Sequence, residues 1–355
     1  MSQEGITQGL TLAQALRFAG GGRVFPDPPR LAFVGAGGKT TALIALGREL
    51  TEGAYRAALL TTTTHLGDWQ AELADHHMRI DEDSDLPSSL PDGVTLFTGR
   101  EVKGGRFGAL PGRALARLYE LAEERQAPLL IEADGSRLRP LKAPAEHEPV
   151  LAEFVDGVVV VAGLTGLGKP LSAEWVHRPE RFAVLAGLNE GESITPQALA
   201  RVLTHPLGGL KGIPPGALRI LLLNQADTSE LQGAGLRIAE MCLSAYQAGI
   251  VASLRPQNAP TASPQVFSVH EPVAIILMAA GASRRFGQPK QLLDWQGQPL
   301  VRHVAQIALA AGCEQVRVVV GAFQEQVRAA LEGLPVEIVA NPAWQEGQAA
   351  SVRAG

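Results

Sequence analysis

Residues 31–44 read LAFVGAGGKTTALI: an apolar run, a glycine-rich turn and the apolar start of a helix. This order is typical of a strand–loop–helix unit that binds phosphate, because glycines let backbone N–H groups point at phosphate oxygens and the helix N-terminus adds positive potential. Lys39 would then reach the β and γ phosphates, and the Thr40 hydroxyl would ligate Mg²⁺. The nucleotide-binding residues predicted from this stretch are Gly35, Gly37, Gly38, Lys39, Thr40 and Thr41.

The turn departs from the longer GxxxxGK[ST] pattern, which needs glycine at the position that Phe33 occupies in this chain. The shorter GxxGKTT form is similar to that of Mur-type ligases. The alternative is a plain strand-to-helix turn with an exposed lysine, which the GKTT run disfavours in this context.

The rhythm of apolar run, turn and helical pattern recurs along the chain and predicts an α/β fold with a parallel sheet. Runs such as Val158–Val161 and Ile220–Leu223 are apolar throughout, as expected for strands that helices cover on both faces. The predicted strands are 31–34, 56–60, 94–98, 128–132, 157–162 and 219–223. The predicted helices are 40–50, 112–125, 196–204 and 228–246.

Residues 255–270 read RPQNAPTASPQVFSVH, whose three prolines favour a linker or an edge segment over a helix. The strand–helix rhythm then resumes with strands at 273–278, 316–320 and 336–339 and helices at 300–311 and 323–332. We therefore assign residues 1–255 to a P-loop nucleotide-binding domain, 256–270 to a linker and 271–355 to a second domain. This second domain is short for a doubly wound nucleotide-binding fold, so we expect it to be truncated.

Composition narrows the class of protein. The chain has 355 residues, with 31 Lys plus Arg against 36 Asp plus Glu and a net charge of −5, which disfavours nucleic acid as the main partner. Its two cysteines, Cys242 and Cys313, form no CxxC pair. The chain therefore has too few cysteines for a disulfide framework or a cysteine zinc site. The start MSQEGITQGL has no export-signal pattern, and no apolar run reaches the ~20 residues that a bilayer needs. We expect a cytoplasmic protein without a membrane segment.

Two carboxylates, Glu132 and Asp134, follow the buried run LLI at 129–131. Acids at the end of a strand beside a phosphate loop hold Mg²⁺ through water or activate a nucleophilic water. With Thr40, they form the predicted metal site. The Asp-Gly pair at 134–135 is also a common turn, and the two interpretations are nearly balanced.

Further polar groups are expected around the same crevice, since open α/β sheets bind ligands at the carboxyl ends of their strands. Arg137, Arg139 and Lys142 suit an anionic ligand, although a solvated basic loop explains them equally well. The run Thr61–Thr64 with His65 offers hydroxyls, although threonine's strand propensity alone would explain it.

Three other patterns receive plainer interpretations. The stretch Gly163–Lys169 matches GxxxxGK, but Pro170 replaces the Ser or Thr, so we expect at most a loop beside the ligand. The NQAD run at 224–227 resembles the NKxD signature of GTPases without its lysine, and helix capping by Asp227 is the preferred role. His76 and His77 fit no standard metal spacing and are expected in a solvated acidic loop.

Several motifs in order carry a family resemblance: GAGGKTT, TTTTH, EADGSRLRPLKAPAEHEPV, the GLGKPL loop, VHRPE at 176–180 and NQAD. Together they resemble the YqeC family, accessory proteins of selenium-dependent molybdenum hydroxylases, over roughly residues 10–255. The resemblance implies a role in maturing such an enzyme, with the hydroxylase apoprotein as a further partner.

The stretch ILMAAGASRRFGQPK at 276–290 follows an apolar strand and resembles the LAAGxSxRxGxxK signature of MobA-like nucleotidyltransferases. Small residues let such a loop wrap a triphosphate, which cationic side chains neutralise. The predicted nucleotide-binding residues here are Ala280, Gly281, Ser283 and Lys290. The predicted catalytic residues are Arg285 and Lys290, the lysine stabilising charge on the α-phosphoryl group as the family implies. A plain basic loop is the alternative.

The stretch NPAWQEGQAASVRAG at 341–355 resembles the segment that lines the base and acceptor side in that family, so Asn341, Gly347 and Ser351 complete the predicted site. Ala279–Ala280 is typical of molybdenum cofactor cytidylyltransferases, which makes CTP the expected donor and a molybdopterin-type cofactor the expected acceptor. The family's magnesium aspartate is expected beyond this stretch.

The sequence thus predicts a P-loop-containing parallel-sheet domain followed by a truncated Rossmann-like nucleotidyltransferase domain. The first would bind ATP or GTP with Mg²⁺, and the second would transfer a nucleotidyl group from CTP. The alternative is a nucleotide-gated accessory protein with a non-catalytic C-terminal remnant.

Overall fold

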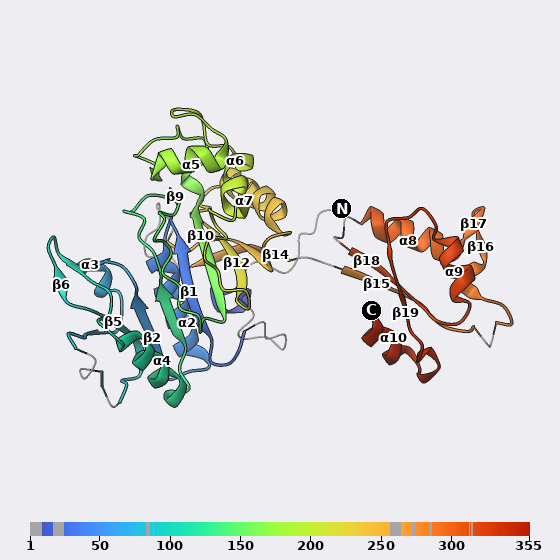
Figure 1. Cartoon of the computed structure of the whole chain (residues 1–355), viewed down its shortest axis with the longest axis horizontal. Helices are drawn as coiled ribbons and strands as arrows, with labels where there is room; N and C mark the ends of the chain where they lie inside the picture. Colours follow the sequence, from blue (N-terminus) through green and yellow to red (C-terminus); the bar gives the residue numbers. More distant parts are fainter. Residues whose placement is uncertain are drawn as a thin grey trace. The chain divides into compact units, whose positions relative to one another are not determined.

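The computed structural model describes residues 9–16, 25–82, 86–87, 89–255, 264–271, 274–283, 286–311, 313 and 315–355. The chain forms two compact units that divide after Glu271 (Figure 1).

The first unit is built on a nine-stranded sheet with β1 at its centre, between β10 and β8. Adjacent strands pair in parallel except at one edge, where β14 pairs antiparallel with β13. In spatial order the strands are β14 (Gln265–His270), β13 (Ala248–Ser253), β12 (Leu218–Asn224), β10 (Gly157–Gly163), β1 (Arg30–Gly35), β8 (Leu129–Glu132), β2 (Ala57–Thr62), β5 (Gly93–Thr98) and β4 (His76–Arg79).

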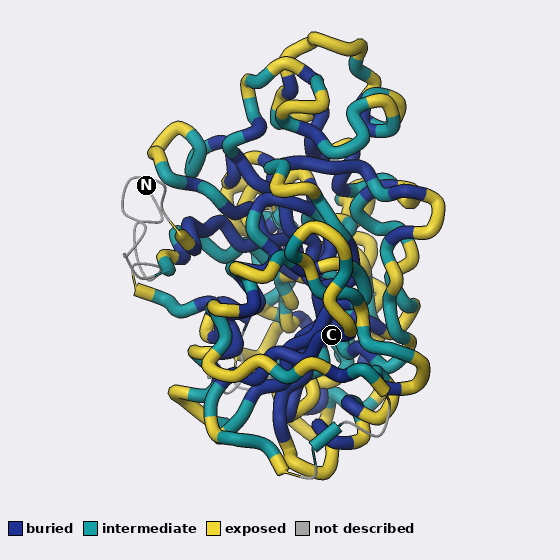
Figure 2. The backbone as a smooth tube through the Cα atoms, turned by 90° about the vertical axis from the view of Figure 1, so that its left-hand side faces the viewer, coloured by how far each residue is buried: buried dark blue, intermediate teal, exposed yellow. Residues whose placement is uncertain are grey.

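Helices cover both faces of this sheet. Alternate residues of a strand point to opposite faces, so a strand that is apolar throughout contributes to a core on each side. Val158 and Val160 pack in one core, and Val159 and Val161 pack in the other. Figure 2 shows the buried backbone in dark blue, with intermediate and exposed segments around it. One core includes residues of α1 (Leu12–Ala15) and α2 (Lys39–Gly53); the other includes residues of α4 (Ala114–Arg125), α5 (Pro179–Ala186), α6 (Pro196–Thr204) and α7 (Ser229–Cys242).

Short helices and strands lie in the loops that follow the carboxyl ends of the strands. They are α3 (Asp68–Ala71), η2 (Leu164–Gly166), the pair β9 (Leu141–Lys142) and β11 (Val176–His177), and the small sheet of β3 (Leu66–Gly67), β7 (Arg106–Phe107) and β6 (Glu101–Val102).

The second unit holds a three-stranded parallel sheet in the order β15 (Ala274–Ala279), β18 (Gln315–Val320) and β19 (Glu337–Ala340). Its core joins Val318 and Val320 to apolar residues of α8 (Leu300–Ala310) and α9 (Gln324–Ala330). The remaining elements are η3 (Lys290–Leu292), β16 (Asp294–Trp295), β17 (Gln298–Pro299), η4 (Trp344–Glu346) and α10 (Gln348–Ala354).

The predicted strands and helices are confirmed in both units, with ends displaced by a few residues. For residues 265–270 the linker assignment is wrong and the edge-segment alternative is confirmed: they form β14, whose backbone pairs with β13 at the edge of the sheet and extends the first unit to Glu271. One further prediction is wrong. His76 and His77, expected in a loop, begin the edge strand β4, whose pairing with β5 does not require apolar side chains. Among the described residues, no helix is long and apolar enough to span a membrane.

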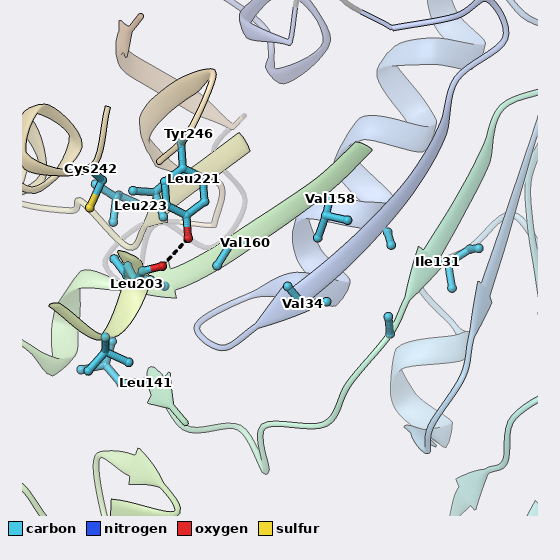
Figure 3. Packing of buried hydrophobic residues seen from close by; sticks show 14 of the residues in the cluster. Val34, Ile131, Leu141, Val158, Val160, Leu203, Leu221, Leu223, Cys242 and Tyr246 are labelled. Atoms are coloured by element: carbon cyan, nitrogen blue, oxygen red, sulfur yellow. Dashed lines mark hydrogen bonds between the residues drawn. The ribbon is translucent and has the colours of Figure 1, made fainter. Parts of the chain in front are cut away.

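The buried Tyr246 hydroxyl donates a hydrogen bond of 2.7 Å to the Leu203 carbonyl at the end of α6 (Figure 3). Tyr246→Phe should lower the free energy of unfolding of this unit by ~1–3 kcal/mol, because the carbonyl loses its buried partner. Hydrogen exchange of β12 peptides, followed by mass spectrometry, should accelerate at least five-fold. Tyr119→Phe is the control: that hydroxyl accepts from Arg30, which keeps its ion pair with Asp156. Equal exchange in wild type and Tyr246→Phe would contradict the assignment.

Candidate functional site

The glycine-rich turn after β1 fits only residues without side chains. Gly35, Gly37 and Gly38 have φ of +98°, +81° and +116°. A Cβ on Gly35 would lie 2.2 Å from the Val161 carbonyl oxygen, and one on Gly37 would lie 2.3 Å from the Gly163 nitrogen. The glycines are therefore required by the close approach of the turn to the end of β10, in addition to any approach to a ligand.

The turn leads into the N-terminus of α2, which has no side-chain cap. Gly38 is the N-cap residue, and Lys39 and Thr40, which follow it, are buried. Within the described residues, the backbone N–H groups of residues 38–41 have no acceptor. Such free donors at the positive end of a helix dipole attract anions.

The three predicted metal ligands lie together below this helix end. Thr40 Oγ1 donates to Glu132 Oε2 at 2.7 Å, and Lys39 Nζ lies 3.3 Å from Asp134 Oδ1 and 3.7 Å from Glu132 Oε1. The register explains this, because Glu132, the last residue of β8, pairs with Phe33 of β1, so Glu132 and Asp134 lie beside the end of β1 and the turn that follows it. The side chain of Gln70 adds a 2.6 Å hydrogen bond to Thr40 Oγ1.

The donor chemistry of this cluster suits magnesium. Burial raises the pKa of Glu132, while the Lys39 charge and the Thr40 hydroxyl oppose that rise. The described residues contain no group of three His, Cys, Asp or Glu side chains that would cage a metal alone. Mg²⁺ commonly takes one or two carboxylates and completes its shell with water and substrate phosphates, so two acids and one hydroxyl fit it.

A chain of buried ion pairs leads away from the cluster. Asp134 accepts the Gly35 N–H and, at 2.8 Å, Lys142 Nζ. Lys142 also binds Glu148 at 2.8 Å, and Arg178 holds Glu148 with two hydrogen bonds of 2.8 and 2.9 Å. Lys142 is thus buried between two carboxylates, so both interpretations of this lysine are wrong: it is neither presented to an anionic ligand nor part of a solvated basic loop.

The pKa of Glu148 falls to about 2 in this arrangement. Burial alone would raise it, but the hydrogen bonds and charges of Arg178 and Lys142 outweigh burial.

A cleft of about 1020 Å³ opens above the cluster. Thr63, Thr64 and His65 line it, as do Arg137 and Arg139 from the loop after β8. The other two threonines of the run point elsewhere.

Both of those hydroxyls are buried in the sheet: Thr61 donates to the Phe97 carbonyl and Thr62 to the Glu132 carbonyl. We expected the run 61–65 to line the cleft, and this is confirmed for residues 63–65 only.

The NQAD run contributes a residue that sequence reasoning missed. Asn224 Nδ2 donates to the Gly37 carbonyl at 2.8 Å, and its oxygen accepts the Leu254 N–H. Asn224 therefore fixes the glycine-rich turn from the end of β12. The capping role assigned to Asp227 is wrong, because the Thr228 hydroxyl caps α7 by accepting from the Leu231 N–H.

In the second unit, the loop after β15 is organised by Ser283 and Gln291. Ser283 Oγ accepts the Lys290 N–H at 3.1 Å, and Gln291 donates to the carbonyls of Ala279 and Gly281. Ala280 is buried at the strand end and Gly281 is exposed. The side chain of Lys290 is exposed, with Nζ 5.3 Å from the Phe286 ring centre. Arg285 lies outside the described residues.

Asn341 and Ser351 are brought together, but as buried partners of each other. Asn341 Nδ2 donates to Ser351 Oγ at 3.1 Å, and the Asn341 N–H donates to the Val320 carbonyl. Gly347, with φ of +111°, is exposed between them in sequence. This geometry fastens α10 to the ends of β18 and β19.

Comparison with known proteins adds to this geometry. Residues 31–180 match the YqeC protein family, and the chain is 34% identical over 208 residues to the Uncharacterized protein YqeC of Escherichia coli K12. The alignment covers 57% of this chain and 78% of that protein. The chain belongs to the YqeC family. No solved structure matches it.

Beyond the YqeC domain, residues 275–355 match the MobA-like NTP transferase domain. This part is 41% identical over 81 residues to Nicotine blue oxidoreductase of Paenarthrobacter nicotinovorans. It is also similar to the Bifunctional protein GlmU of Halorhodospira halophila, with 47% identity over 73 residues. These alignments cover 22% and 20% of this chain, and 40% and 15% of the two relatives. The second unit is a MobA-like NTP transferase domain, which implies nucleotidyl transfer from a nucleoside triphosphate.

The depressed pKa of Glu148 predicts how the YqeC domain responds to acid. Its folded pKa of about 2 lies below the ordinary 4.5, so its contribution to stability is complete above about pH 5 and is lost as pH falls toward 2. Glu148→Gln should flatten this part of the pH profile, measured as Tm between pH 5 and 2.5. It should also lower Tm at pH 7 by several degrees, because Lys142 and Arg178 lose their shared carboxylate.

The matched control is Glu146→Gln, which removes an exposed acid two residues away that pairs only with Arg181 among the described residues. That variant should keep the wild-type acid slope. Equal slopes for Glu148→Gln and wild type would show that Glu148 does not titrate as stated.

Proposed function

We propose that the YqeC domain binds ATP or GTP with Mg²⁺ in its cleft, and that the MobA-like domain transfers a cytidylyl group from CTP to a molybdopterin-type cofactor. Both would serve, in the cytoplasm, the maturation of a molybdenum hydroxylase whose apoprotein is a further partner. The observation that carries the first half is the uncapped N-terminus of α2, with Lys39 beside two carboxylates.

Binding of a triphosphate would rearrange the partners of Lys39. Its ammonium group donates to the Gly35 carbonyl at 2.7 Å, within the turn itself. A phosphate above the helix end would offer a stronger, charged acceptor. Thr40, Glu132 and Asp134 would hold the Mg²⁺, which neutralises phosphate charge when bound.

In the second domain, the terminal phosphate of the acceptor would attack the α-phosphorus of CTP. The bond to the β-phosphate breaks, and pyrophosphate leaves. Lys290 and Arg285 would neutralise the charge on the transferred group, while Ser283 and Gln291 hold the loop in shape. Catalysis of this kind depends on positioning and charge stabilisation rather than on a protein nucleophile. Asn341, Gly347 and Ser351 would shape the base and acceptor side.

A nucleotide-gated accessory protein is the second candidate, with a non-catalytic C-terminal unit. The buried chain from Lys39 through Asp134 and Lys142 to Glu148 favours it. A phosphate that draws Lys39 away from Asp134 would alter the charge balance at the other end of this chain. Slow hydrolysis that accelerates only with the hydroxylase apoprotein would support this candidate.

Lys39→Ala should weaken binding of Mg·ATP or Mg·GTP by at least ten-fold, which corresponds to the ~1.5–3 kcal/mol of a charged hydrogen bond. Titration calorimetry on the full chain measures this. Lys169→Ala is the matched control: it removes the lysine of the second GxxxxGK match, which contacts Trp175 and does not line the cleft. Unchanged affinity in Lys39→Ala would remove the glycine-rich turn from the nucleotide site.

Lys290→Ala should leave that first affinity within two-fold and abolish CTP binding or its turnover to pyrophosphate. The assay is ³¹P NMR of the chain with Mg²⁺, molybdopterin and, in turn, ATP, GTP and CTP. Arg328→Ala, an exposed cation in the last turn of α9, is the control and should behave as wild type. Pyrophosphate from CTP that persists in Lys290→Ala would refute the catalytic assignment. Orthophosphate from ATP or GTP alone would favour the second candidate.

A further inference from the structure

A second recess, of about 600 Å³, adjoins the cleft of the YqeC domain. The two share the side chains of Arg137, Arg139, His147, His177 and Arg178, so the recess continues the cleft away from the glycine-rich turn. We call these five residues, with the hollow they border, the basic recess. Its volume lies within the 300–1,000 Å³ typical of small-molecule sites.

Two guanidinium groups of the basic recess, those of Arg137 and Arg139, form no ion pair in the part of the chain that the structure describes, although the acids Glu146 and Glu180 also line the hollow. Arg178, in contrast, is held by Glu148. A guanidinium group can bind a phosphate with two parallel hydrogen bonds, so the side chains of Arg137 and Arg139 beside a hollow are suited to bind an anion.

The imidazole of His177 also lines the basic recess. Its pKa is lowered to about 4, first by burial and then by the charges of Arg178, Lys142 and Arg137. The imidazole is therefore neutral at pH 7, when it can donate one hydrogen bond and accept another. Its lowered pKa agrees with a surplus of positive charge around the recess.

Three non-glycine residues in or beside the basic recess have a strained backbone conformation. Arg137, Leu138 and Arg178 have φ of +50°, +60° and +66°, and all three line the cleft. A non-glycine residue in this conformation persists only where neighbouring structure enforces it. Here the Gly37 N–H donates to the Arg139 carbonyl at 3.2 Å, which fastens the strained loop directly to the glycine-rich turn.

We infer that the basic recess binds the phosphate of a second small-molecule ligand, a phosphate monoester, next to the nucleotide. The charge of a monoester dianion matches the guanidinium groups of Arg137 and Arg139, and the hollow leaves room for its organic part. The recess and the turn share the backbone link between Gly37 and Arg139, so the two ligands would lie in one continuous cleft. The position beside a nucleotide rests on the proposed function; the binding of phosphate does not.

The test is titration calorimetry of the full chain with inorganic phosphate and with phenyl phosphate, each with and without saturating Mg²⁺ and a non-hydrolysable ATP analogue. Binding of both probes should persist when the analogue is bound. The double variant Arg137→Asn, Arg139→Gln should weaken binding of both probes at least ten-fold, with and without the analogue.

The substitutions are chosen to preserve the loop. Asparagine tolerates the left-handed φ at position 137, and Arg139 holds Gly37 through its backbone carbonyl, which Gln retains. Arg139→Gln alone serves as the second variant if the double variant melts early. Arg117→Gln, an exposed arginine on α4 paired with Glu120, is the matched control and should bind both probes as wild type does.

The outcomes separate this inference from the proposed function. Phosphate binding that Lys39→Ala abolishes and the arginine variants do not would mean that phosphate binds only at the glycine-rich turn, which overturns the inference and leaves the nucleotide proposal intact. Arginine-dependent phosphate binding without analogue binding would support the recess and overturn the nucleotide proposal. Probe binding that the analogue displaces completely would also overturn a separate second site.

Discussion

The carboxylate of Asp134 is the point on which the YqeC domain's cleft depends. It is buried, accepts the Gly35 N–H, and lies 2.8 Å from Lys142 and 3.3 Å from Lys39. A buried charge is tolerated only when it is paired and hydrogen-bonded, and removing one partner leaves the others uncompensated. Asp134 therefore fixes the turn after β1, the end of β8 and the strand β9 with one side chain.

The same constraint explains the shape of the loop beyond it. Lys142 also forms an ion pair with Glu148, and Glu148 forms one with Arg178. The backbone of Arg178 has a left-handed conformation. Ion pairs buried in this way contribute little net stability compared with apolar packing, but they require a single arrangement of the groups that form them. The fixed arrangement leaves Arg137 and Arg139 to border the hollow.

Much of this fold was predictable from local pattern. The strand β10 is apolar throughout, and β8 and β12 contain the apolar runs Leu129–Ile131 and Ile220–Leu223, so their own residues predict that they are buried between helices. The edge strands were not predictable in the same way. β4 reads HHMR and β14 reads QVFSVH, and neither is an apolar run like the central strands. Each pairs along its backbone with a single strand of the sheet, and only Met78 of β4 and Val266, Phe267 and Val269 of β14 reach the cores. Pairing of this kind depends on a distant segment, which no local pattern reveals.

The residues of the candidate site likewise include some that local sequence predicts and others that depend on distant contacts. Thr40, Glu132 and Asp134 were expected together because they follow neighbouring strand ends. Asn224 was missed because its partner, the Gly37 carbonyl, lies 187 positions away in sequence. Its place at the carboxyl end of β12 was the signal that pointed to the cleft. In the second unit, the pairing of Asn341 with Ser351 arises only when α10 folds back toward the strand ends.

The short form of the glycine-rich turn has a physical reason in this fold. Phe33, where a longer loop would need glycine, is fully buried in β1 and pairs with Glu132. The N–H groups that follow are engaged within the protein: Gly35 with Asp134, Ala36 with the Val161 carbonyl and Gly37 with the Arg139 carbonyl. A phosphate can therefore be met only by the donors from residue 38 onward and by Lys39, at the free end of α2. The rest of the turn joins the sheet to the loop that carries Arg137 and Arg139, the two arginines without an ion pair among the described residues.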